Sequence, residues 1–260
     1  TVTQANAYAT AAGVVTATIS NTDIADLDDL TTANTDQLTI TVASTSATAA
    51  QLTTVAGATG LNVTATAVET VTGTATQMDA LLLAEGTTGD KINLDDNYTI
   101  TIDSGTATVT QANAYGAATD GVVTATISNG TITTLDDLTT GSADQLTITV
   151  ATASVTAAAL TTVAGATGLN VTATAVETVT GTATQMDALL LVEGSTGDKV
   201  NLDGDFAVTV SNGTTTATQL NSYNSATSSL VNATAVAAIS GSVSDLTTLV
   251  GNEGTSGDAV

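Results

Sequence analysis

The chain has 260 residues, of which 42% are hydrophobic, 2% aromatic and 10% charged. Two basic residues against 25 acidic ones give a formal net charge of −23, which repels phosphate backbones and anionic membranes. No run approaches the roughly 18 apolar residues of a membrane span, and neither histidine nor cysteine is present. These features exclude nucleic-acid binding, membrane insertion, disulfides and histidine-based catalysis.

Periodicity in the first 107 residues predicts strands and short helices in alternation. The strand segments alternate apolar residues with threonine, whereas the helical segments carry capping boxes or leucines at helical spacing. In chain order, the expected elements are a helix opening at Thr1, a strand at 14–20, a helix at 22–32, a strand at 38–42, a helix at 49–60, a strand at 61–68, a helix at 74–86 and a strand at 97–103.

Helix starts are marked by the pattern Thr-x-x-Gln, in which the two side chains satisfy backbone N–H groups at the helix N-terminus. These boxes open at Thr1, Thr48, Thr74, Thr108, Thr182 and Thr216. The helix at 74–86 is expected to end at Gly86, a residue suited to a helix C-terminus. The side chains expected to face the core are Leu38, Ile40 and Val42 on one strand, and Ile24, Leu27, Leu30, Met78, Leu81 and Leu82 on two helices.

The chain repeats itself at a shift of 108 residues. Residues 52–95 return at 160–203, and "TQANAY" at 3–8 returns at 110–115 and, degraded, as "TQLNSY" at 218–223. We therefore divide the chain into repeat unit 1 (1–107), repeat unit 2 (108–215) and a partial repeat unit 3 (216–260).

Near-identical strand–helix pairs, with a step of roughly 23–31 residues, predict an α/β fold. Parallel strands joined by helical crossovers would stack into a repeat solenoid, the expected fold class. An all-β solenoid is the alternative, against which the capping boxes argue. The absence of proline fits interior strands that donate hydrogen bonds to both neighbours.

One stretch also carries a family resemblance. "VTATAVETVTGTATQMDALL" at 63–82 and 171–190, with "AAQLTTVAGATG" at 49–60, resembles the Thr/Ala-rich repeat arrays of giant secreted or surface proteins of bacteria, of the cyanobacterial type. The resemblance implies an extracellular or cell-surface location in a bacterium. It also implies a scaffold, adhesion or motility-associated role, with no catalytic residues to transfer.

Calcium is the only cofactor for which the sequence offers candidate ligands. Two turns, "NLDDNYT" at 93–99 and "NLDGDFA" at 201–207, gather oxygen ligands of the kind calcium uses. The candidate ligands are Asp95, Asp96, Asp203 and Asp205. Because Asp, Asn and Gly also fill turns for backbone reasons, a plain turn is the favoured interpretation, with weak calcium binding as the alternative.

Seven Thr-x-Thr pairs form the most regular candidate surface. On parallel strands they would stack into rows of hydroxyl and methyl groups. The rows would comprise Thr16, Thr18, Thr39, Thr41, Thr64, Thr66, Thr99, Thr101, Thr124, Thr126, Thr147, Thr149, Thr172 and Thr174. A flat array of this kind would suit ice binding, whereas strand propensity or burial in an assembly are the competing explanations.

Together these patterns predict a non-enzymatic extracellular structural protein that forms, or belongs to, a filament, stalk or surface scaffold. Ice or surface binding through the threonine rows and a calcium-stiffened adhesin segment are the alternatives. Because neither end carries a polar capping unit, we expect a piece of a longer array or self-association, end to end or side by side.

Overall fold

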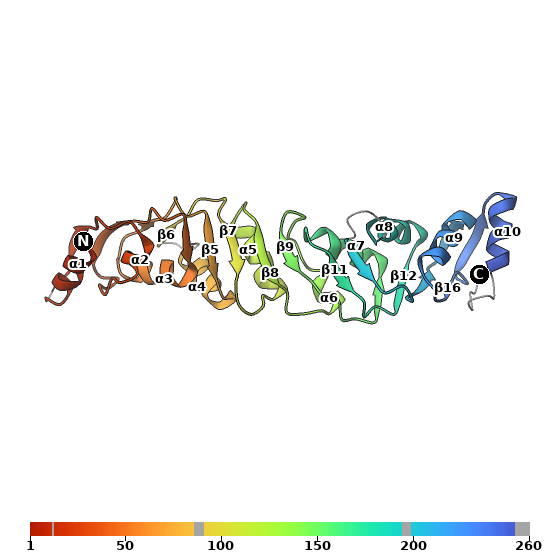
Figure 1. Cartoon of the computed structure of the whole chain (residues 1–260), viewed down its shortest axis with the longest axis horizontal. Coiled ribbons are helices and arrows are strands. Elements are labelled where there is room, and N and C mark those ends of the chain that lie inside the picture. The colour runs from red at the N-terminus through yellow and green to blue at the C-terminus, as the bar shows by residue number, and fades with distance from the viewer. Residues whose placement is uncertain (12, 86–90, 194–198, 253–260) are drawn as a thin grey trace. The chain divides into compact units, whose positions relative to one another are not determined.

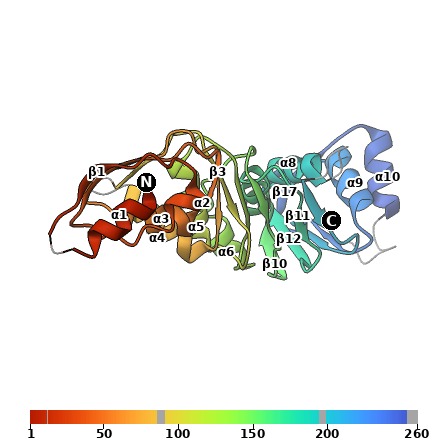
Figure 2. The ribbon, with the colours of Figure 1, turned by 60° about the vertical axis from the view of Figure 1, so that its left-hand side comes forward.

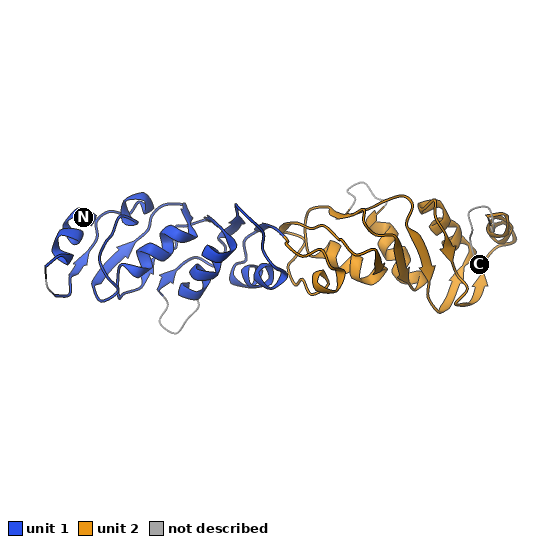
Figure 3. Ribbon diagram, turned by 90° about the horizontal axis from the view of Figure 1, so that it is seen from below, with its two compact units in different colours: residues 1–126 blue, residues 127–260 orange. Residues whose placement is uncertain are grey.

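The computed structural model describes residues 1–11, 13–85, 91–193 and 199–252, which form a mixed α/β fold (Figure 1). Parallel strands alternate with helices, as predicted, and the helices exclude the all-β alternative. The chain divides into two compact units, residues 1–126 and 127–260 (Figure 3). Their boundary does not coincide with the repeat boundary at 107/108, and each unit is considered separately.

Unit 1 contains the sequence "VVTAT" twice, at 14–18 and at 122–126, and each copy includes a strand. The elements of unit 1 are α1 (Val2–Ala9), β1 (Thr16–Thr18), α2 (Ile24–Leu27), β2 (Gln37–Thr41), β3 (Ser46–Thr48), α3 (Ala49–Gly57), β4 (Val63–Thr64), β5 (Thr70–Gly73), α4 (Ala75–Glu85), β6 (Ile92–Asn93), β7 (Thr99–Ile102), α5 (Val109–Ala118) and β8 (Val123–Thr126).

Two parallel sheets run through unit 1. The first has the strand order β1-β2-β4-β6, and the second pairs β3, β5, β7 and β8 in that order. The chain visits the first sheet, then the second, and then forms a helix: β2, β3 and α3 are followed by β4, β5 and α4, and then by β6, β7 and α5. The predicted order of one strand per helix was therefore incomplete, because it omitted β3, β5 and β6. Of these, β3 and β6 have only three and two residues, too few to show a period of two.

Unit 2 repeats this plan. Its elements are α6 (Ile132–Leu135), β9 (Gln145–Thr147), β10 (Ser154–Thr156), α7 (Ala157–Gly165), β11 (Val171–Ala173), β12 (Thr178–Gly181), α8 (Ala183–Glu193), β13 (Val200–Leu202), β14 (Ala207–Val210), β15 (Gly213–Thr216), α9 (Ala217–Ala226), β16 (Val231–Asn232), β17 (Val236–Ser240) and α10 (Val243–Asn252). Parallel pairing gives the orders β10-β12-β14-β16, β11-β13 and β15-β17.

The predicted inner faces are confirmed. Leu38, Ile40 and Val42 are at most 1% exposed, and the threonines between them are exposed. On α4, Met78 and Leu81 are fully buried, while Leu82 is only half-buried. The largest buried side chains are aromatic, which a composition of small aliphatic residues did not predict: Tyr98, Tyr115, Tyr223 and Phe206.

All six predicted capping boxes form. In each, the backbone N–H of the glutamine donates to the threonine hydroxyl, and the glutamine Oε1 accepts from the threonine N–H. The helix expected over 22–32 is shorter, since α2 ends at Leu27 and the N–H of Leu30 bonds to Leu27 in a tighter turn. Gly86, expected to end the helix at 74–86, lies outside the described residues.

Candidate functional site

Helix α5 is joined to helix α4 by two polar side chains that meet one carboxylate. The hydroxyl of Tyr115 lies 2.9 Å from the carbonyl oxygen of Ala75 and 2.9 Å from Oδ1 of Asp79. The other oxygen of Asp79 accepts a 2.7 Å hydrogen bond from Nε2 of Gln111. We call this arrangement of Tyr, Gln and Asp the connector, because its bonds span 32 to 40 residues of the chain.

Unit 2 contains the same connector between α8 and α9. The hydroxyl of Tyr223 lies 2.8 Å from both the carbonyl of Ala183 and Oδ1 of Asp187. Nε2 of Gln219 donates to Oδ2 of Asp187 at 2.6 Å. These four residues stand 108 positions after their counterparts in unit 1, so the contact belongs to the repeat and is not a unique site.

The glutamine of the connector acts at both ends of its side chain. Oε1 of Gln111 accepts from the backbone N–H of Thr108 at 2.9 Å and completes the capping box of α5. Its Nε2 is thereby directed toward Asp79. The start of one helix and its contact with the previous helix therefore depend on the same side chain.

The tyrosines of the connector are held as neutral donors. Burial, followed by the hydrogen bond to Asp79 and its charge, raises the pKa of Tyr115 well above the usual value of 10.0. Burial and Asp187 raise the pKa of Tyr223 in the same way. Both effects disfavour a tyrosinate beside a carboxylate, so each hydroxyl keeps its proton and donates it to the contact.

The asparagine of the same sequence motif contacts the main chain in or just after the following helix. Nδ2 of Asn6 on α1 donates to the carbonyl of Asp29 at 2.8 Å, and its Oδ1 accepts from the N–H of Thr31 at 2.8 Å. On α9, Nδ2 of Asn221 reaches the carbonyl of Asp245 at 3.1 Å. The motif is thus two-sided. In α5 and α9 its Gln and Tyr bind the helix before it. In α1 its Asn binds the segment just after α2, and in α9 its Asn binds α10.

Asn221 makes only half of this forward contact. Its Oδ1 is buried and has no hydrogen-bond partner among the described residues. The N–H that would correspond to that of Thr31 belongs to Thr247, which lies inside α10, where backbone N–H groups bond within the helix. Because α2 is short, the N–H of Thr31 is available to its asparagine. Because α10 is longer, the corresponding N–H of Thr247 is used within the helix.

Both lysines of the chain bind main-chain oxygens just after a helix. Nζ of Lys91 lies 3.2 Å from the carbonyl of Gly60, and Nζ of Lys199 lies 3.0 Å from that of Gly168. These carbonyls follow α3 and α7, where the helix dipole favours a positive charge. The lysines therefore stabilise the turns that link neighbouring steps of the repeat.

Four buried threonines after helices form a second polar feature that sequence patterns did not reveal. The hydroxyl of Thr59 is fully buried, donates to the carbonyl of Leu38 at 2.8 Å and accepts from the N–H groups of Leu38 and Leu61. It therefore satisfies backbone groups of two successive steps of the repeat. Equivalent bonds are made by Thr119, Thr167 and Thr227.

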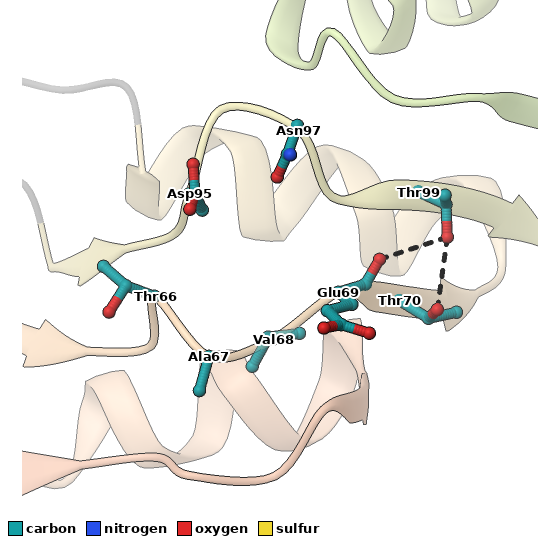
Figure 4. Close-up of a pocket in the computed structure, with 8 residues that line it drawn as sticks. All are labelled: Thr66, Ala67, Val68, Glu69, Thr70, Asp95, Asn97 and Thr99. Carbon is teal, nitrogen blue, oxygen red and sulfur yellow. Dashed lines mark hydrogen bonds between the residues drawn. The ribbon is translucent and has the colours of Figure 1, made fainter.

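The candidate calcium ligands of unit 1 line two different hollows. Asp95 lines a hollow of about 460 Å³ together with Glu69 and Asn97, and the two carboxylates lie apart in Figure 4. Asp96 lines a separate hollow of about 180 Å³, next to Thr119. The sequence neighbours Asp95 and Asp96 are therefore not brought together.

In unit 2, Asp203 and Asp205 are exposed. Oδ1 of Asp203 accepts the N–H of Gly204 at 2.9 Å, the bond expected of a plain turn. The described residues contain no group of three or more acidic side chains placed to hold a metal ion. The turn geometry therefore favours the backbone explanation for these acids.

Strand register interrupts the predicted threonine rows in the first sheet. Thr41 faces Thr64, but the next residue in that row is Asn93. At the edge of the sheet, Thr16 faces Gln37. The matching row of unit 2 runs through Thr149, Thr172 and Asn201. Thr18 faces Thr39, as the predicted row requires. The other exposed members are Thr66, Thr126, Thr147 and Thr174.

Four of the predicted threonines of unit 1 belong to the other sheet: Thr99 and Thr101 lie on β7, and Thr124 and Thr126 lie on β8. Thr101 pairs with Thr72 and with Thr124, and Thr99 pairs with Thr70. Thr99, Thr101 and Thr124 are half-buried, and the hydroxyl of Thr99 donates to Oγ1 of Thr70 at 3.2 Å (Figure 4). The seven pairs therefore do not form one continuous outward-facing array.

The connector was missed because Asp79 and Asp187 look like ordinary surface acids on helices. The signal that would have found it is the joint recurrence of Tyr and Asp at the same repeat shift. In the described part of the chain, no helix combines the length and apolar character that a membrane crossing requires. Comparisons of the chain with protein-family models, with curated proteins and with solved structures gave no match.

Proposed function

We propose that the chain is a non-enzymatic structural repeat protein, an α/β solenoid segment that serves in an extracellular filament, stalk or surface scaffold. The observation that carries the proposal is the connector, which occurs twice at equivalent positions. In both units its polar side chains join one helix to the next. A helix–helix contact that recurs in each repeat fits a structural role better than a catalytic one, since an active site normally occurs once per chain.

The charged groups support the same assignment. Asp36 accepts the N–H groups of Val15 and Ala33 at 2.7 and 2.9 Å, and these bonds lower the pKa of its carboxyl. Lys91 and Lys199 bind main-chain carbonyls. These side chains stabilise turns of the repeat, which is a structural use of charge.

The resemblance to Thr/Ala-rich bacterial arrays supports an extracellular or cell-surface location. Of the two alternatives, ice binding is disfavoured by the interrupted threonine rows, and a calcium-stiffened adhesin by the separation of Asp95 from Asp96.

Imaging tests the proposal directly. Immunogold electron microscopy of the producing cells, with cell fractionation alongside, should place the protein in elongated assemblies outside the cytoplasm. A matched label that recognises an unrelated cytoplasmic protein serves as the control. A diffuse cytoplasmic distribution, or turnover of any glycan, ester or phosphate substrate by the purified chain, would overturn the assignment.

A further inference from the structure

The tetrapeptide "SNGT" occurs twice in unit 2, at 128–131 and at 211–214. One copy precedes α6 and the other precedes α9, two helices that lie apart in Figure 2. Asparagine followed by glycine readily loses its side-chain amide, because glycine has no side chain to hinder attack by its own backbone nitrogen. Since the two copies are chemically identical, a difference in their reactivity in the folded protein must come from the fold.

The first copy forms a turn that brings the reacting atoms together. The side chain of Asn129 is exposed, and its Oδ1 accepts the N–H of Thr131 at 2.8 Å. This bond closes a small ring that also contains Cγ of Asn129 and the nitrogen of Gly130. The carbon to be attacked and the attacking nitrogen therefore lie in one compact turn. The same N–H polarises the side-chain carbonyl and favours a negative charge on its oxygen.

Gly130 supplies a free nitrogen. In the ranges that the structure describes, its N–H donates no hydrogen bond, and residues 129–131 belong to neither a helix nor a strand. A close approach favours glycine here, since a Cβ at position 130 would lie 2.6 Å from the carbonyl oxygen of Thr149. The packing of unit 2 thus keeps the reactive Asn-Gly pair in place.

The second copy lacks this arrangement. Gly213 is the first residue of β15, where it pairs with Val236 and has a φ of 131°. No hydrogen bond of the described residues joins the side chain of Asn212 to the N–H of Thr214. The strand therefore restrains the glycine, and the asparagine side chain is not held over it.

Unit 1 carries a different pair at the positions equivalent to the first copy. There Asn21 is followed by Thr22. Oδ1 of Asn21 accepts the N–H of Val2 at 3.2 Å, and its Nδ2 donates to Asp26 at 3.0 Å. Because its side chain is bound to other partners and a β-branched residue follows it, Asn21 is an internal reference that should not react.

We propose that Asn129 is a site of spontaneous deamidation in the folded protein, a chemistry that goes beyond the proposed function and does not depend on it. The backbone nitrogen of Gly130 loses its proton and bonds to Cγ of Asn129. The bond from Cγ to Nδ2 then breaks, and Nδ2 leaves with that proton as ammonia. Water opens the cyclic imide at either carbonyl carbon, which gives aspartate or isoaspartate at position 129. The net reaction consumes water and releases ammonia, with no oxidant or reductant.

Isoaspartate at this position should loosen the turn, because it adds a methylene group to the main chain. The carbonyl of Gly130 accepts the N–H of Ala151 at 2.8 Å, and its backbone lies close to Thr149. A longer main chain strains both contacts, since a packed site has little room to adjust. We therefore expect the N–H of Ala151 to exchange faster in aged protein. The variant Asn129→Asp, which leaves the main chain unchanged, should not show this.

Peptide mapping by mass spectrometry tests the proposal on the full chain. Folded protein and a parallel sample in urea are incubated at neutral pH, then digested with pepsin at acidic pH, where deamidation is slow. In the folded chain, Asn129 should be converted about tenfold or more faster than Asn212, whereas in urea the two should react at similar rates. A folded chain in which Asn129 stays an amide, or reacts no faster than Asn212, would overturn the proposal.

Two variants locate the reaction. Thr131→Pro keeps the Asn-Gly pair but removes the N–H that binds Oδ1, and the φ of Thr131, −76°, suits proline. Conversion of Asn129 should then slow in the folded chain and stay unchanged in urea. Asn129→Gln should abolish the mass change of this peptide. Circular dichroism confirms that each variant is folded. An undiminished folded-state rate in Thr131→Pro contradicts the part assigned to the turn.

Discussion

Helices α1 and α5 carry the same six residues, "TQANAY", and differ in what lies before them. In α5, Tyr115 is buried against α4 and its hydroxyl meets Asp79. In α1, the identical Tyr8 is exposed. Because the local sequence is the same, the neighbouring helix decides whether the tyrosine is a core residue or a surface one. The role of a repeated residue is therefore set by its position in the array.

The largest expected difference is between alanine substitutions of these two tyrosines. Tyr115→Ala should lower the free energy of unfolding by about 3–5 kcal/mol, since it removes a fully buried ring and leaves a cavity. Tyr8→Ala should change it by less than about 0.5 kcal/mol, as is usual at exposed positions. Urea unfolding monitored by circular dichroism measures both. Similar losses for the two variants would show that exposure does not distinguish them.

Two leucines on α4 sharpen the comparison within one helix. Leu81 is fully buried and Leu83 is 69% exposed. Leu81→Ala should cost about 2–5 kcal/mol of unfolding free energy, while Leu83→Ala should cost less than about 0.5 kcal/mol. Since the two substitutions are chemically identical, helix propensity cancels between them. Thermal melts that move equally would contradict the assigned inner face of α4.

The carboxylate of the connector should have a smaller effect. Asp79→Ala removes the acceptor of Gln111 and one of the two acceptors of Tyr115. We expect a loss of about 1.5–3 kcal/mol of unfolding free energy, the usual range for hydrogen bonds to a charged group. Asp103→Ala is the control, because Asp103 is also exposed but is not part of a connector. Hydrogen exchange should show faster opening of α5 in the Asp79 variant only. Unchanged protection of α5 would contradict the prediction that the connector holds α5 to α4.

Alkaline pH should produce the most gradual change. The folded state raises the pKa of Tyr98, Tyr115 and Tyr223, chiefly through burial. Above pH 10.0 the unfolded chain loses tyrosine protons that the folded chain retains, so stability is fully present below that pH and falls as the pH rises further. Urea midpoints between pH 8 and 12 would measure the slope, with Tyr115→Phe as the variant in which it should be reduced. A flat profile would contradict the buried hydroxyls.

The sequence predicted those parts of the fold that depend on neighbouring residues. Alternation of Leu38, Ile40 and Val42 with threonine identified a strand and its inner face, because side-chain direction along a strand has a period of two. The capping boxes identified helix starts, because both partners lie three residues apart. Short strands such as β3 and β6 have too few residues to carry such a pattern.

Features that depend on register or on distant partners were not predictable. Thr16 pairs with Gln37, Ile40 with Val63, and Val63 with Ile92, so successive pairings enclose unequal lengths of chain. Rows of threonine cannot be deduced without those lengths. The connector likewise joins Tyr115 to Asp79 across 36 residues. Only the shared repeat shift of Tyr and Asp hinted at a contact.

The placement of the two lysines bears on resistance to proteolysis. Trypsin-like enzymes cleave after lysine or arginine, and this chain offers only Lys91 and Lys199. Both ammonium groups are bound to carbonyls, and the carbonyl of each lysine accepts a sheet hydrogen bond, from Val63 and from Val171 respectively. Cleavage at either bond requires the strand to leave its sheet first. In a protein exposed to secreted proteases, the only two tryptic sites would thus be held in place by the hydrogen bonds of its own sheets.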